Sequence, residues 1–345
     1  MKKFLSIALA LLMVCVMLPV VALAAEKTAS TYEELKSAIS TANDGDTIKL
    51  LADIDLSQTI TVNKTITLNM NGKKLYNTRD LWDNPTTDNW SLISVRGSGN
   101  LTITGNGTFA AKENDCYAVD VQESATVTIK NGTFIGNIHA VYVFAGTANV
   151  EGGTYSVQQK YPDPAKGDEF VLNCYDANRA NGTAHINVTG GTFKNFNPAD
   201  NKAEGEGNNF ADNSLVVQKN NTVQNNDYYV GNAANEVIAA ASKGEEIFVL
   251  NGTTLTNVPA GVIIQNRTGD RITVNGKDVE LTGDAGYTVP ASNITIIVPG
   301  DTTPTETPKT EEQKNPSTGA NDFVGLAAAA AVVALLGSAV VLRKK

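Results

Sequence analysis

The sequence predicts an all-β fold in which the chain coils and stacks its strands in parallel, a parallel β-helix. Short segments alternate apolar and polar residues with period two, the pattern of a half-buried strand. A strand that ends in a Gly-Thr-aromatic step recurs, and no amphipathic helix separates its copies, which is typical of a repeat architecture. The four copies span Leu101–Phe109, Val127–Phe134, Ala148–Tyr155 and His185–Phe193.

A second short strand precedes each copy, and a fifth example follows the last one. Two or three strands per unit without a helix do not suit a βαβ fold, so we expect a coil that returns to the same place after each unit. The general handedness of parallel crossovers makes the expected coil right-handed. The alternative is an antiparallel β-sandwich, although hairpin signals do not alternate with the strands in pairs. The second strands are Ser91–Val95, Tyr117–Val121, His139–Val143, Val171–Tyr175 and Ser214–Gln218.

The residue types fit this architecture. Ile, Val, Leu and Phe at alternate positions would fill a narrow core, while Gly and Asn would occupy corners that need positive φ. Thr and Asn at equivalent positions would form side-chain ladders. The unit lengths imply insertions, mainly Ser156–Phe170 and Asn195–Asn213. Insertions in a solenoid collect on one face, where binding is usually built.

Residues 1–25 have the pattern of a secretory signal peptide. Lys2 and Lys3 precede an almost continuous apolar run, Phe4–Val21. Ala22-Leu23-Ala24 is a small-x-small cleavage signal, so we expect cleavage after Ala24 or Ala25. The alternative is a retained membrane anchor.

We assign residues 26–230 to the β-helix domain. Tyr32–Asn43 predicts a short helix, with Ser30 or Thr31 as its cap, that would cover the open N-terminal end of the coil. Strands are expected at Thr47–Leu51, Gln58–Val62 and Thr65–Met70. This arrangement resembles the start of pectate-lyase-like β-helix proteins. The resemblance covers about Ser30–Gln218 and is one of pattern, without a diagnostic motif.

Residues 231–298 partly repeat the N-terminal segment, since both contain a helix, a Gly-acidic turn and a strand. They form either a small β module of their own or a C-terminal cap of the coil, and we slightly favour the module. Residues 299–314 are rich in Thr, Pro and Glu and have almost no apolar side chains to bury, which predicts a disordered linker.

The last segment, 315–345, has three parts: a short motif, an apolar run and a basic end. The run 323–342 has about the length that spans a bilayer, and Arg343-Lys344-Lys345 would remain in the cytoplasm. We therefore expect a transmembrane helix over 323–342. The motif lies just before this run. The motif residues are Asn315, Pro316, Ser317, Thr318 and Gly319.

This tripartite tail resembles the sorting signal of Gram-positive surface proteins, whose usual motif is Leu-Pro-x-Thr-Gly. The resemblance implies that a sortase cleaves between Thr318 and Gly319 and that peptidoglycan is joined to Thr318. It also implies an extracellular protein, covalently attached to the cell wall after passing through a membrane-anchored precursor. Asn315 departs from the usual Leu, which leaves the sortase class open. The alternative is a plain tail-anchored helix.

Composition narrows the classes of partner. The chain has 27 basic and 36 acidic residues, and removal of 1–25 and 319–345 leaves 22 and 35, a net charge of −13. An acidic chain does not suit nucleic acid, and it opposes binding of polyanionic pectin.

Cys116 and Cys174 fall two coils apart, beyond disulfide reach, so we expect two free, partly buried thiols. Two His without clustered ligands predict no metal and no cofactor.

The residues favour binding over catalysis. Glycosidases need two suitably spaced carboxylates. Of the positions expected to point outward from the second strands, only Asp120 is acidic, with Asp176 one step beyond the row. His139 and His185 are expected to be strand-face residues. The full set of expected outward positions is Ser94, Asp120, Tyr142, Cys174 and Val217.

The same row is a candidate ligand site. Tyr142 would stack on a sugar ring, Asp120 and Asp176 would accept hydroxyl hydrogen bonds, and Trp82 and Trp90 lie in a loop nearby. We therefore expect a wall-anchored protein that binds a carbohydrate or a surface protein of a host or neighbouring cell. The alternative is an extracellular polysaccharide lyase or glycoside hydrolase, and a third is a structural spacer.

Overall fold

The computed structural model describes residues 24–81, 91–113, 117–159, 170–200, 209–222, 225–280 and 285–291. The chain divides into two compact units, Met1–Asn293 and Ile294–Lys345, and every described residue belongs to the first. Within the described ranges no helix has the length and apolar character needed to cross a bilayer. The predictions that lie outside these ranges concern most of the signal 1–25, Trp82, Trp90, Cys116, the linker 299–314, the motif Asn315–Gly319 and the span 323–342.

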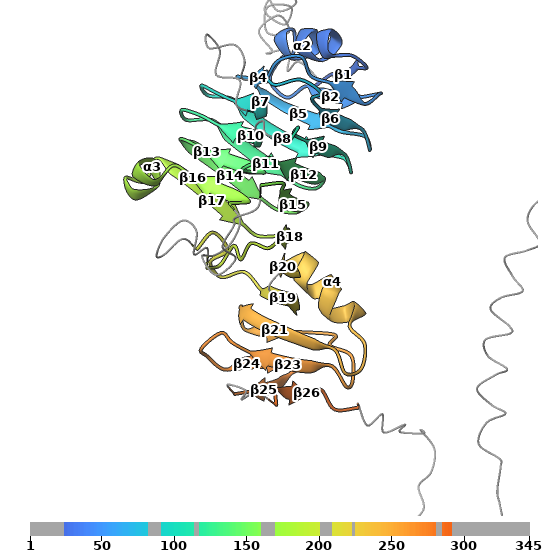
Figure 1. Cartoon of the computed structure of the whole chain (residues 1–345), viewed down its shortest axis with the longest axis vertical. Helices are drawn as coiled ribbons and strands as arrows, with labels where there is room; N and C mark the ends of the chain where they lie inside the picture. Colours follow the sequence, from blue (N-terminus) through green and yellow to red (C-terminus); the bar gives the residue numbers. More distant parts are fainter. Residues whose placement is uncertain are drawn as a thin grey trace, which may run out of the picture. The chain divides into compact units, whose positions relative to one another are not determined.

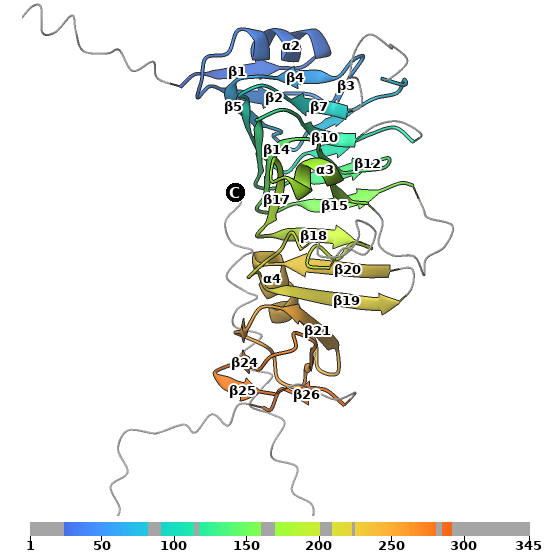
Figure 2. The same cartoon turned by 90° about the vertical axis from the view of Figure 1, so that its left-hand side faces the viewer.

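The described chain is mainly β, with stacks of parallel strands, as predicted. Successive strands visit sheets A, B and C in turn, so each coil lies against the next (Figures 1 and 2). Pairing within these stacks is parallel throughout, which contradicts the antiparallel sandwich.

Sheet A contains β1 (Glu26–Ala29), β2 (Thr47–Leu50), β5 (Thr65–Asn69), β8 (Asn100–Thr104), β11 (Thr126–Ile129), β14 (Gly146–Val150) and β17 (Ala184–Val188). Sheet B begins with β3 (Ile54–Asp55), β6 (Lys74–Tyr76), β9 (Thr108–Ala110), β12 (Thr133–Gly136), β15 (Thr154–Val157) and β18 (Gly191–Lys194). Sheet C contains β4 (Ile60–Val62), β7 (Ser91–Val95), β10 (Tyr117–Val121), β13 (Val141–Val143) and β16 (Leu172–Cys174).

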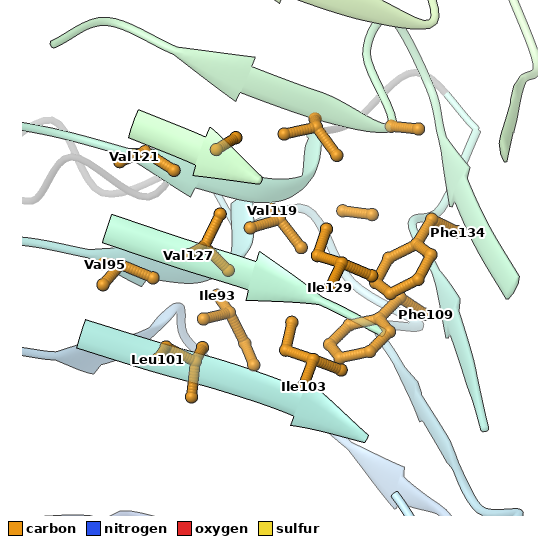
Figure 3. Packing of buried hydrophobic residues seen from close by; sticks show 14 of the residues in the cluster. Ile93, Val95, Leu101, Ile103, Phe109, Val119, Val121, Val127, Ile129 and Phe134 are labelled. Carbon is orange, nitrogen blue, oxygen red and sulfur yellow. The ribbon is translucent and has the colours of Figure 1, made fainter. Parts of the chain in front are cut away.

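The aromatic residues of the Gly-Thr-aromatic steps stack inside the coil. Phe109 pairs with Phe134 in register, and their ring centroids are 4.7 Å apart. Figure 3 shows these two rings beside Ile103 and Ile129 of sheet A. Tyr155 continues the stack at 5.1 Å from Phe134, and Phe193 follows at 5.0 Å. The recurring step therefore places one aromatic ring per coil at the same point of the core. The four rings belong to an aromatic ladder that consists of Phe109, Phe134, Tyr155 and Phe193.

The turn before Tyr155 shows why these steps contain glycine. Gly153 has φ +101°, and a Cβ there would lie 3.0 Å from the carbonyl oxygen of Gly132 in the preceding coil. A larger residue would be strained by both its backbone conformation and this contact. The Tyr155 hydroxyl donates to the Gly152 carbonyl at 2.6 Å, and burial raises the pKa of Tyr155.

Polar ladders run outside the core, as expected. Thr128, Asn149 and Asn187 occupy equivalent positions on sheet A. Asn187 Nδ2 donates to Asn149 Oδ1 at 3.0 Å, so neighbouring coils are also linked by side chains.

The predicted N-terminal helix is α2 (Tyr32–Ser40). Thr31 Oγ1 accepts from the Glu34 N–H at 3.2 Å, while Glu34 Oε2 accepts from the Ser30 N–H at 2.7 Å, a reciprocal cap. The helix ends before the predicted Asn43 because Asp46 accepts from the Asn43 N–H at 3.0 Å and holds this stretch as a turn. Its bonds to backbone N–H groups lower the pKa of Asp46. Leu35 and its neighbours on the same face are buried in the main core.

Beyond β18 the next three pairings in sheet B are antiparallel. β20 (Asn225–Val230) pairs with β18 and with β19 (Val216–Thr222), and β19 pairs with β21 (Glu246–Asn251). The other elements here are α4 (Asn232–Ala240), β22 (Thr254–Leu255), β23 (Ile263–Asn266), β24 (Ile272–Val274), β25 (Lys277–Val279) and β26 (Tyr287–Thr288). Sheet B thus continues into the region 231–298, whereas the buried apolar residues form two clusters, Ala29 to Val230 and Val217 to Val289.

Two expected outward positions were wrong. The residue in register with Tyr142 is Asn173, whereas Cys174 pairs with Val143 and is buried. A shift of one residue moves every side chain of a strand to the other face, so an alignment by motif alone failed here. Val217 lies in antiparallel β19 of sheet B and is buried, because the chain reverses after β18 and does not form another strand of sheet C.

Candidate functional site

The outer face of sheet C carries the candidate site. The residues that alternate with its buried inner positions form two rows. The first row contains the register partners Thr61, Ser94, Asp120, Tyr142 and Asn173. The second row contains the residue that follows each strand, namely Asn63, Arg96, Gln122, Phe144 and Tyr175.

Two longer connections lead into the strands of this face. Residues 77–90 join β6 to β7, and residues 158–171 join β15 to β16, so both lead from sheet B to sheet C. The predicted insertion Ser156–Phe170 therefore leaves the coil beside the candidate site, although 160–169 lie outside the described residues. A short helix, α3 (Asp176–Ala180), lies between β16 of sheet C and β17 of sheet A.

Asp120 is at the centre of the face but is only 1% exposed. Ser94 Oγ donates to its Oδ2 at 2.9 Å, and Gln122 Nε2 donates to its Oδ1 at 2.8 Å. Arg96 supports this network, since its Nε donates to Ser94 Oγ at 2.8 Å and its Nη2 lies 3.9 Å from Asp120 Oδ2. A buried carboxylate needs such partners, so the contacts give Asp120 a structural role. The sequence had predicted that Asp120 would accept hydrogen bonds from a ligand. In the structure, side chains of the protein occupy both of its carboxylate oxygens instead.

Tyr142 lies next to Asp120 in the register, as expected, and is half-buried. Its ring centroid is 4.9 Å from that of Tyr117 and 5.4 Å from that of His139. Phe170 completes this aromatic cluster with an edge contact to His139 at 6.1 Å. Tyr142 is therefore packed among aromatic rings rather than open on both faces.

His139 is buried between Phe170 and Asn173. Its Nδ1 lies 2.8 Å from the Phe170 carbonyl oxygen, which only accepts, so Nδ1 carries the proton. Nε2 then accepts from Asn173 Nδ2 at 3.1 Å. Burial lowers the pKa of His139 to about 4, and the ring is neutral at pH 7. These contacts fit a role in packing and in fixing the corner before β13. His139 precedes that strand and is buried, so it is not the strand-face residue that the sequence predicted.

His185 lies in β17 and is exposed, with Nε2 2.8 Å from the Gly182 carbonyl oxygen. The second histidine is thus placed on a strand face, as expected. His139 lies before β13 of sheet C and His185 lies in β17 of sheet A. No group of three or more His, Cys, Asp or Glu side chains that could hold a metal occurs among the described residues.

The exposed aromatic residues of sheet C follow β13 and β16. Phe144 is 39% exposed and Tyr175 is 44% exposed, and their ring centroids are 4.8 Å apart at an interplanar angle of 26°. Sequence reasoning missed both residues. The signal was present, because each follows the last inward residue of a sheet C strand, Val143 or Cys174. Only the correct register shows that they are neighbours.

Asp176 follows Tyr175 directly and begins α3. Its side chain is 76% exposed and lies 3.6 Å from Arg179 Nη2. The structure therefore places Asp176 beside the exposed aromatic pair and outside the row that contains Asp120. Trp82 and Trp90, the remaining residues of the predicted site, lie outside the described ranges.

The N-terminal end of the same face borders a depression of about 510 Å³. Thr61, Asn63 and Arg96 of sheet C line it on one side, and Tyr32 and Lys36 of α2 line it on the other. The Lys36 ammonium lies 5.8 Å from the Tyr32 ring centroid. The outer face of sheet C thus begins at a depression and ends at an exposed aromatic pair.

Comparison with known proteins gives no relative. No family model matches the sequence, and neither a curated protein nor a solved structure is significantly similar to it.

Proposed function

We propose that this chain is a cell-wall-anchored surface protein that presents a binding face outside a Gram-positive cell. The signal peptide 1–25 would direct secretion, and the segment 315–345 would retain the precursor in the membrane until a sortase joins Thr318 to peptidoglycan. The apolar run 323–342 and the basic residues after it support this reading. The protein would then be extracellular and covalently attached to the wall.

The stacked parallel sheets support the finer architecture in this proposal. Residues 26–230 would form a right-handed, pectate-lyase-like β-helix capped by α2, and 231–298 would form a small β module or a C-terminal cap. The linker 299–314 would hold this unit away from the wall. A coil of this kind is a rigid platform, because each strand is hydrogen-bonded to the coil before and after it.

The exposed Phe144–Tyr175 pair is the observation that carries the binding role. Aromatic rings with polar neighbours hold both sugars and proteins. Asp120, the acid that a glycan-cleaving reading would use, is buried and bonded through both carboxylate oxygens. The geometry of this face therefore favours a surface that holds a partner over one that cleaves it. The acidic charge disfavours nucleic acid as that partner.

Binding is tested with cells that display the full chain. Display cells and cells without the protein are placed on mucin, matrix proteins and a panel of glycans, and adherent cells and released sugar are measured in the same wells. Saturable adhesion without released sugar supports the proposal. Released sugar would instead show a polysaccharide lyase or hydrolase.

The anchor gives a separate prediction. We expect Thr318→Ala to abolish the wall-linked form, because the resemblance implies that the sortase attacks the main-chain carbonyl at this position only when the motif supplies the threonine side chain. The measurement is the amount of protein released by a muramidase from washed walls, compared with protein in the membrane. Thr310→Ala in the linker is the matched control and should leave anchoring unchanged. Wall linkage that persists in Thr318→Ala would contradict the proposed signal.

A further inference from the structure

Phe144 and Tyr175 form an exposed aromatic shelf on the candidate face. Among the described residues, they and Leu51 are the exposed large hydrophobic side chains. The four rings of the aromatic ladder on sheet B, by contrast, are completely buried. The fold therefore buries the aromatic ladder inside the coil and leaves the Phe144–Tyr175 pair in solvent.

The backbone fixes the two rings at one corner of the coil. The Phe144 N–H donates to the Val121 carbonyl at 2.9 Å, and the Tyr175 N–H donates to the Val143 carbonyl at 2.9 Å. The two residues therefore occupy equivalent places in consecutive coils. Asn178 Nδ2 donates to the Phe144 carbonyl at 2.7 Å and ties α3 to the same corner. A shelf held in this way loses little conformational entropy when a ligand binds.

The end of sheet C leaves the shelf open. Among the described residues β16 is the last strand of this sheet, and no sixth strand there places another ring against Tyr175. One face of the Tyr175 ring meets Phe144, and its exposure of 44% shows that much of the remaining surface is in solvent. The C–H face of a pyranose ring packs on aromatic surface of this kind.

Polar groups lie beside the rings. Asp176 is 76% exposed and is held 3.6 Å from Arg179, so a carboxylate acceptor and a guanidinium donor are close together. Sugar hydroxyl groups both donate and accept hydrogen bonds, and this pair offers both. The combination of a small apolar shelf and a charged rim suits a sugar, which has an apolar face and a polar edge.

The size of the apolar surface distinguishes a sugar from a protein partner. A stable protein interface buries about 1,200–2,000 Å² and has an apolar centre. Leu51, the other exposed large hydrophobic among the described residues, follows β2 and is four coils from Tyr175, so it does not enlarge the shelf. Two rings are enough for one or two sugar units.

The charge of the chain selects the kind of sugar. Residues 26 to 318 carry a net charge of −13, which opposes binding of a uronate or another acidic sugar. We propose that the shelf of Phe144 and Tyr175, with Asp176 at its rim, binds a neutral pyranose of a cell-surface or matrix glycan. This proposal rests on the proposed function, since it names the ligand class of the same face.

Saturation-transfer NMR tests the proposal with the full-length chain in a detergent that contains no sugar. The probes are methyl β-D-galactopyranoside and methyl β-D-glucopyranoside, with sodium glucuronate as the acidic comparison. We expect transfer to the ring C–H protons of at least one neutral sugar, little transfer to glucuronate, and a dissociation constant of about 1 mM or weaker.

Substitutions assign the binding to the shelf. Phe144→Ala and Tyr175→Ala should each reduce the transfer about fivefold or more, because each removes part of the stacking surface. Tyr175→Phe should retain most of it, and Leu51→Ala should retain all of it. Circular dichroism checks that each variant is folded. If Tyr175→Ala is unfolded, Tyr175→Gln replaces it in the experiment. No transfer to either neutral sugar, or equal transfer in the alanine variants, would overturn the proposal.

An adhesion assay separates this proposal from the display role. Cells with the Phe144→Ala/Tyr175→Ala chain that adhere as well as wild type would leave the display role intact and reject the shelf. Shelf-dependent adhesion that survives periodate oxidation of the target's glycans would identify a protein partner and likewise reject the sugar. A wild-type chain that is absent from the wall would instead reject the anchoring, while the NMR result would still decide the shelf.

Discussion

Phe134→Ala is expected to lower the free energy of unfolding by about 3–5 kcal/mol, the usual cost of removing a buried Phe side chain. Phe134 is fully buried, with Phe109 at 4.7 Å on one side and Tyr155 at 5.1 Å on the other. Alanine would leave a cavity between two rings that the strand hydrogen bonds hold apart. Stability in a repeat architecture depends on contacts between neighbouring units, so loss of a central ring also weakens the link between coils.

The measurement is chemical denaturation of the fragment 26–293. Phe144→Ala is a matched control, because it is the same change in the same coil at a side chain that is 39% exposed. We expect it to cost less than about 1 kcal/mol. Similar losses in the two variants would show that the aromatic ladder does not have the stabilising role that its packing implies.

Acid should destabilise the protein through His139. Its pKa is about 4 in the folded chain, below the ordinary 6.5, because burial disfavours the charged ring. The unfolded chain therefore takes up a proton as the pH falls below 6.5, while the folded chain stays neutral until about pH 4. The contribution of His139 to the free energy of unfolding is therefore fully present above pH 6.5 and is lost as the pH falls from 6.5 to 4. The loss amounts to about 3 kcal/mol.

The difference between wild type and His139→Phe isolates this effect from the titration of carboxylates. Phenylalanine keeps a ring against Tyr117 and Tyr142 but has no proton to take up. The variant should be less stable at pH 7, since it loses the bonds to Phe170 and Asn173, and its stability should fall less between pH 6.5 and 4. His185→Phe is the control, because His185 is exposed and is the second of the two histidines. Parallel pH profiles for wild type and His139→Phe would contradict the assignment.

The parallel stacking could be predicted because it follows from local rules. Each Gly-Thr-aromatic step gives a turn, and period-two alternation gives an apolar inner face. Copies of the same local structure bury this face when they lie in register, so Phe109 meets Phe134 and Tyr155 without further information. The cap at Thr31 was predictable for the same reason, since its hydrogen bonds join residues four or fewer positions apart.

The candidate site was predicted less well. The sequence placed Asp120 beside Tyr142 correctly, but it assigned the next position to Cys174 instead of Asn173. It therefore did not bring Phe144 and Tyr175 together. A motif alignment tolerates a shift of one residue across an insertion, whereas a strand does not, because the shift would move a buried side chain into solvent.

Within the Gly-Thr-aromatic copies, the sequence by itself determined which side chains point into the coil, because alternation and turn residues act over a few positions. Only the tertiary structure decided which outward side chains remain in solvent. Asp120 and Phe144 both point out of sheet C, yet Asp120 is 1% exposed and Phe144 is 39% exposed. The physical reason is that exposure depends on contacts between residues of different coils, such as Ser94 with Asp120, and these contacts exist only after the coils have stacked.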